Sequence, residues 1–206
     1  TGVQTCALPI SYQQVPDNIE GGDIMNERVF TFAALVDNQA GVLSQVARLF
    51  SRKGYNIHSI ASGPTVDPEI TRITIELITD EDRANQIALQ LAKLIPVHSV
   101  KILSPETSIR REFVMIKVKV EDGTKRNDVI QIANIFRASI IDVSIGSLTL
   151  AIIGDEAKIE GLQNVLSEFE ILELVRTGYI ALERGQETIY DKTKVKGEFD
   201  YGKNVL

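Results

Sequence analysis

Cysteine is almost absent from this sequence, and so are histidine and long apolar runs. The single cysteine, Cys6, has no second cysteine to pair with, which excludes an intramolecular disulfide and a multi-thiolate zinc site. It also lies in an N-terminal stretch that differs from the rest of the chain. No uninterrupted apolar run reaches the ~18 residues that a transmembrane helix requires. These absences predict no membrane span and favour a cytoplasmic protein.

The residues that usually carry catalysis are also missing. The two histidines, His58 and His98, have no acidic cluster nearby at metal-ligand spacing. The sequence contains no glycine-rich phosphate loop and no nucleophile elbow. The net charge of −6, without a basic face, argues against nucleic acid as a partner. We therefore expect a binding protein that has no catalytic residue and no metal site, and that is not an enzyme on its own.

Residues 1–24 look foreign to the remainder of the chain. The stretch 1–10 resembles the translation of a sequencing-library adapter, and it lacks the charged start and long apolar core of a signal peptide. Met25 directly precedes the first strand-like run. We expect residues 1–24 to be a non-native or disordered leader and the protein itself to begin at Met25.

Residues 25–103 show the element order β-α-β-β-α-β, which is typical of a ferredoxin-like domain. The first helix carries apolar residues at helical spacing and ends at Gly54, a usual C-terminal signal. The acidic run Asp80–Asp82 suits the start of the second helix. The predicted strands are 28–36, 56–62, 70–79 and 97–103, and the first helix is 42–53.

After a polar linker, 104–109, the same order repeats in residues 110–184. Val114, Ile116 and Val118 alternate with polar or larger residues, as in a strand with one buried face. The predicted strands are 112–120, 140–144, 147–153 and 171–182, and the helices are 125–137 and 155–169. Residues 185–206 lack periodicity and predict a mobile or partner-contacting tail. The fold class is therefore α+β, with two tandem ferredoxin-like (βαββαβ) domains.

The junction between the first strand and the first helix is a candidate binding site. Gly41 lies where the loop becomes helix, so the free amides of the first helical turn can face a carboxylate. Asn38 can accept a hydrogen bond from an ammonium group or donate one to a carboxylate. Together they suggest a pocket for a free amino acid. The alternative is that Asn38 only makes a turn and Gly41 only eases the start of the helix.

Longer segments give a more specific resemblance. Residues 37–44 (DNQAGVLS), 49–57 (LFSRKGYNI) and 134–143 (NIFRASIIDV) resemble the acetolactate synthase small (regulatory) subunit family. By this resemblance, residues 25–103 of this chain correspond to an ACT domain, a regulatory ferredoxin-like module. The resemblance spans roughly Arg28 to Arg184.

The resemblance implies a regulatory role in valine, leucine and isoleucine biosynthesis. The implied partner is the large catalytic subunit, which holds thiamine diphosphate, Mg and FAD and forms 2-acetolactate from pyruvate; this chain would hold no cofactor. The small subunit activates that partner and confers feedback inhibition by a branched-chain amino acid, usually valine. ACT domains pair in a homodimer, and the effector binds between them. The implied effector residues are Asn38, Gly41, Val42 and Leu43 of one subunit and Asn56 and Ile57 of the other. The alternative is a freestanding ACT-type amino-acid sensor that acts on another protein.

Overall fold

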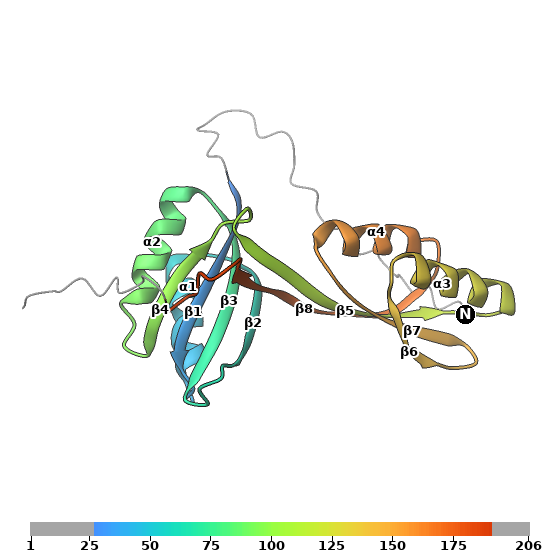
Figure 1. Cartoon of the computed structure of the whole chain (residues 1–206), viewed down its shortest axis with the longest axis horizontal. Helices are drawn as coiled ribbons and strands as arrows, with labels where there is room; N and C mark the ends of the chain where they lie inside the picture. The colour runs from blue at the N-terminus through green and yellow to red at the C-terminus, as the bar shows by residue number, and fades with distance from the viewer. Residues whose placement is uncertain (1–26, 191–206) are drawn as a thin grey trace, which may run out of the picture.

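The computed structural model describes residues 27–190, which form two four-stranded sheets that each carry two helices on one face (Figure 1). The element order is β-α-β-β-α-β, twice. This confirms the predicted α+β fold with two tandem ferredoxin-like domains. The predicted leader, 1–24, the start at Met25 and residues 191–206 of the predicted tail lie outside the described residues.

The first sheet has the strand order β2-β3-β1-β4, and all of its pairs are antiparallel. Asp80 accepts a hydrogen bond from the Arg83 amide at 2.8 Å, which confirms the acidic start expected for the second helix. The elements are β1 (Arg28–Asp37), α1 (Val42–Lys53), β2 (Ile57–Pro64), β3 (Ile70–Thr79), α2 (Glu81–Ala92) and β4 (Val97–Leu103).

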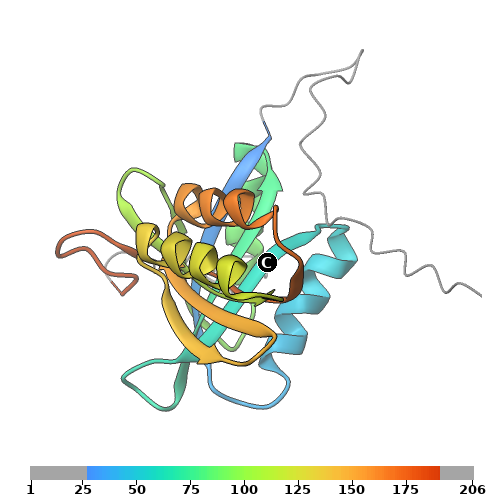
Figure 2. The same cartoon turned by 90° about the vertical axis from the view of Figure 1, so that its right-hand side faces the viewer.

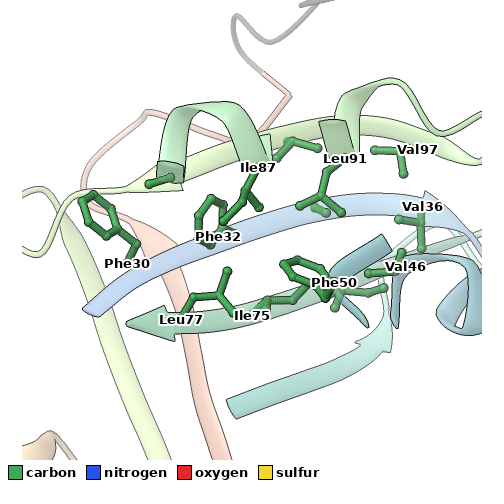
Figure 3. Close-up of a cluster of buried hydrophobic side chains, with 14 of the residues drawn as sticks. Phe30, Phe32, Val36, Val46, Phe50, Ile75, Leu77, Ile87, Leu91 and Val97 are labelled. Carbon is green, nitrogen blue, oxygen red and sulfur yellow. The ribbon is translucent and has the colours of Figure 1, made fainter. Parts of the chain in front are cut away.

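The core of this domain lies between the sheet and its two helices (Figure 3). Phe32 of β1, Phe50 of α1 and Leu91 of α2 are at most 1% exposed. Strands alternate their faces with a period of two, whereas helices present one side with a period of 3.6. The apolar side chains of β1, β3, β4, α1 and α2 therefore converge on one layer, as Figure 3 shows for ten labelled side chains.

The second sheet has the equivalent order, β6-β7-β5-β8. Val114, Ile116 and Val118 are fully buried, which confirms the predicted alternation. They face α3 and α4, which lie side by side over the sheet in Figure 2. The elements are β5 (Ser108–Lys119), α3 (Gly123–Ile135), β6 (Ser139–Val143), β7 (Ser147–Gly154), α4 (Glu156–Leu166) and β8 (Ile171–Glu183).

Strands β5 and β8 extend beyond the second domain. They have 12 and 13 residues, and they run together from the second domain to the first (Figure 1). The structure starts β5 at Ser108, four residues before the predicted start at Glu112. Arg110 and Arg111 interrupt the apolar alternation there, because this part of the strand faces the other domain instead of the second core. We call this paired segment, residues 108–112 and 179–183, the ribbon.

The ribbon covers the outer face of the first sheet. Ala181 packs with Ala33, Leu35 and Leu103 in a second apolar cluster. Strand β1 is therefore buried on both faces, which explains its continuous apolar run.

The chain after β8 also packs on this face. Ile189 is 4% exposed within the same cluster, and its carbonyl accepts a hydrogen bond from Ser99 Oγ at 2.8 Å. The first residues of the predicted tail thus belong to the packed structure, because they complete the cover of a sheet face that two helices alone leave open.

Replacing Ile189 by alanine should test this cover. We expect Ile189→Ala to lower the free energy of unfolding by about 2–3 kcal/mol, because it removes buried methylene and methyl groups. Ile180→Ala is the matched control, since Ile180 is 59% exposed; it should change the value by less than about 0.5 kcal/mol. Urea denaturation followed by circular dichroism measures both. Equal effects would show that residues 185–190 do not stabilise the fold.

Candidate functional site

The loop between β1 and α1 holds Asn38 in one orientation. Asn38 Nδ2 donates to the Pro68 carbonyl at 2.8 Å, and its backbone N–H donates to the Glu69 carbonyl at 2.7 Å. These bonds fix the side chain against the loop that joins β2 and β3. Because the nitrogen is the donor, Oδ1 is left as the acceptor. Asn38 is exposed, so this acceptor is reachable from solvent.

Gly41 is the N-cap residue of α1 and has a left-handed backbone, with φ 88° and ψ −12°. An added Cβ would meet nothing within 4 Å, so the backbone angle and not crowding favours glycine here. Asp80, Asp122 and Asp155 cap the other three helices within residues 27–190 by accepting a first-turn amide. In that part of the chain only α1 has no side-chain cap.

Two first-turn amides of α1 remain available. Val42 N–H already donates to the Gln39 carbonyl at 3.3 Å, and Gln45 N–H donates to the Gly41 carbonyl at 3.0 Å. The amides of Leu43 and Ser44 lie between them, at the positive end of the helix dipole. Ser44 was not among the predicted site residues. The helix boundary could have indicated it, since the second and third helical residues carry the free amides.

The predicted site residues of this loop therefore have different environments. The Val42 side chain is 5% exposed and packs in the first core, so it faces away from the loop surface. Leu43 is 48% exposed and presents an apolar side chain beside the free amides.

Asn56 and Ile57 lie at the opposite end of α1. Asn56 is exposed in the loop after the helix, and Ile57 opens β2. A helix of 12 residues is about 18 Å long. The structure thus places the six predicted residues in two groups on one chain and does not bring them together. β2 is an edge strand of the first sheet, so the second group lies where another strand could be added.

The two histidines have unrelated surroundings. His98 Nε2 lies 2.5 Å from Asp37 Oδ1, one residue before Asn38. His58 sits at an irregular step in the β2–β3 pairing, between Ile57 and Ser59. Within residues 27–190 no group of three or more His, Cys, Asp or Glu side chains is placed to hold a metal ion. Over the same residues, no helix has the length and apolar character needed to cross a bilayer.

A second polar cluster lies where the ribbon meets the first sheet, beside a cavity of about 260 Å³. Its carboxylates, Glu76 of β3 and Glu112 of β5, are 1% and 2% exposed. Arg110 pairs with Glu76, and Arg176 pairs with Glu112. The sequence places Glu76 with Thr74 on the face away from the core, but it cannot show that the ribbon buries that face.

Tyr179 lines the same cavity as Glu76, Glu112 and Arg176. The Arg110 guanidinium carbon is 4.8 Å from the centre of its ring, a cation–π contact. Burial is the main cause that raises the pKa of the Tyr179 phenol above its usual range. We refer to Glu76, Glu112, Arg110, Arg176 and Tyr179 as the junction cluster.

Two family models match this chain, one over each of the two domains. Residues 32–99 match the family described as AHAS small subunit-like ACT domain, and residues 111–185 match the small subunit of acetolactate synthase. A probable acetolactate synthase small subunit of Methanothermobacter thermautotrophicus is 43% identical over 76% of this chain and 94% of its own length. The Haemophilus influenzae small subunit is 39% identical over 76% of this chain and 96% of its own length.

A solved structure agrees with these sequence matches. The acetolactate synthase small subunit from Thermotoga maritima superposes with a TM-score of 0.73 at 34% identity. The match covers 78% of this chain and 99% of that protein. Because sequence and fold both match over nearly the whole length of these relatives, the chain belongs to the acetolactate synthase small-subunit family.

Proposed function

We propose that this chain is the regulatory subunit of an acetolactate synthase and that it binds a branched-chain amino acid, most simply valine, for feedback inhibition. Family membership supports the regulatory role, since the relatives are named as small subunits. The partner is then a large catalytic subunit, which carries thiamine diphosphate, Mg and FAD and works in the cytoplasm. This chain activates that subunit and contributes no catalytic residue.

The observation that carries the effector proposal is the uncapped N-terminus of α1. An α-carboxylate accepts hydrogen bonds from the amides of Leu43 and Ser44, in the role that an aspartate plays in the other three helices of residues 27–190. Asn38 Oδ1 accepts from the α-ammonium group, held in place by the Nδ2 bond to Pro68. The exposed Leu43 side chain contacts the aliphatic part of the effector.

Asn56 and Ile57 complete the site from a second copy of the chain. Since they lie about 18 Å from Gly41 on one subunit, they can reach the loop only across a two-fold axis. Antiparallel pairing of β2 with its counterpart sets the start of one β2 beside the end of the other. The end of β2, at Pro64, leads into the loop to which Asn38 is bonded. A homodimer through the first domains therefore forms two equivalent sites.

Regulation follows from linkage. An effector that binds one arrangement of the dimer more tightly raises the population of that arrangement and changes the activity of the attached catalytic subunit. No chemistry in this chain is needed.

Association with the catalytic subunit is the first test. When co-expressed with the large subunit of the same source, the tagged chain should co-purify with it and raise acetolactate formation several-fold. The chain alone should form none. Failure to associate, with valine binding intact, would favour a freestanding sensor that acts on another protein.

Gly41→Asp should weaken valine binding at least tenfold, because two carboxylates about 4 Å apart near a protein surface repel by up to roughly 4 kcal/mol. Gly41→Asn is the matched control: it has the same size and tolerates the left-handed backbone equally, without the charge. Calorimetry and valine inhibition of the complex measure both variants. If Gly41→Asp keeps full valine sensitivity, the carboxylate does not bind at the start of α1.

Mixed dimers test the two-copy site. Asn38→Ala and Asn56→Ala should each abolish valine binding on its own. Co-expressed chains form heterodimers in which one site carries both changes and the other carries neither. About a quarter of all sites should then bind valine with wild-type affinity, if the subunits mix at random. No recovered binding would show that the six residues do not form one site across two chains.

A further inference from the structure

Strand β2 connects the proposed effector site to the junction cluster, and this inference rests on the proposed function. Asn56 and Ile57 lie at the start of β2, and Ser59 follows two residues later. The β2–β3 register shifts between Ile57 and Ser59, so His58 is an irregular step in the ladder. Such irregularities re-aim the neighbouring side chains. Ser59 thus lies at the irregular step of the ladder, two residues from the effector end of β2.

Glu76 joins three elements at one buried carboxylate. Ser59 Oγ of β2 donates to Oε2 at 2.9 Å. Thr31 Oγ1 of β1 donates to Oε1 at 3.2 Å, and the Arg110 guanidinium of the ribbon pairs with the same oxygen. The carboxylate is 1% exposed, and it accepts from one side chain of each of these three elements. Glu76 therefore links β2 directly to the ribbon.

The second buried carboxylate of the junction cluster, Glu112, is also held by several hydrogen bonds. Glu112 accepts from Arg176 Nε at 3.0 Å and from the Gly178 amide at 3.2 Å. Gly178 has φ 74°, and an added Cβ there would lie 3.1 Å from Ser59 Cβ. β8 thus passes close over β2 at the residue that bonds Glu76. Strand β8 continues from this point into the second sheet.

We propose that Ser59, Glu76 and Arg110 are positioning residues that couple effector binding on β2 to the orientation of the second domain. The buried ion pair between Glu76 and Arg110 holds the ribbon to the first sheet in one arrangement. Effector binding that displaces β2 changes the bond from Ser59 to Glu76 and moves the ribbon with it. The second domain, which shares the ribbon strands, then takes up a different orientation toward the catalytic subunit.

The test uses the full chain and its complex with the large catalytic subunit. Glu76→Gln keeps the size of the side chain and removes the charge that Arg110 pairs with. Ser59→Ala is the milder variant, since Glu76 keeps Thr31 and Arg110. Lys101→Met is the matched control: Lys101 pairs with Glu183 of the ribbon at 2.6 Å, but from β4, on the sheet edge opposite β2.

We expect Glu76→Gln and Ser59→Ala to bind valine within about threefold of the wild-type affinity while the maximum inhibition of the complex falls by about half or more. Lys101→Met should be inhibited as the wild type is. Hydrogen exchange of the full chain gives a second readout. Valine should alter exchange in β5 and β8 of the wild type, and in Glu76→Gln the change should stay within the first domain.

Three results would overturn the coupling. The first is full inhibition of the complexes that carry Glu76→Gln and Ser59→Ala. The second is a loss of valine binding in these variants that matches their loss of inhibition. The third is an equal loss of inhibition in Lys101→Met. Failure of the proposed function has a different signature, because the wild-type complex itself would then show neither valine binding nor inhibition. Thermal melting identifies a variant that has not folded, and Ser59→Ala then decides the result.

Discussion

The pairing of β5 with β8 is the constraint on which the rest of this structure depends. The two strands supply half of the second sheet, and their far ends, with Ala181, close the outer face of the first. Each domain has its own apolar core, but the outer face of the first sheet is covered only because strands of the second domain extend over it as the ribbon. The buried charges at the crossing follow from this arrangement. Glu76 is desolvated by the ribbon, and Arg110 of the same ribbon neutralises it.

Helix α1 serves the proposed regulation through both of its ends. Its N-terminus lacks the aspartate cap of the other three helices in residues 27–190, which leaves amides for an anion. Its C-terminus leads through Asn56 into β2. The length of the helix separates these two groups, so a two-fold axis is needed to bring one next to the other. In the proposed homodimer each effector contacts both subunits, so effector binding is a property of the pair.

Much of the fold could be predicted from the sequence, because a strand or helix with one buried face has apolar residues at regular spacing. Val114, Ile116 and Val118 alternate as a strand over a core must, and Asp80 precedes a helix as a cap must. The ribbon could not be predicted, since Arg110 and Arg111 interrupt the apolar alternation and only the opposing domain explains them. For the same reason the burial of Glu76 was not visible. Gly41 and Asn38 could be identified as a candidate pair, whereas the burial of the Val42 side chain depends on the exact start of α1.

The late position of Ala181 and Ile189 in the chain has a consequence during synthesis. The first domain has all four of its strands once Leu103 is made, but the cover of Ala33, Leu35 and Leu103 is not yet translated. Synthesis proceeds at roughly 5–20 residues per second. This apolar face therefore stays uncovered for several seconds while the rest of the chain is made. In that interval the nascent chain exposes the apolar outer face of the sheet, and chaperones bind exposed apolar surface of this kind. Messages that lack the 3′ end would leave the first domain in that state permanently, even though its own core is complete.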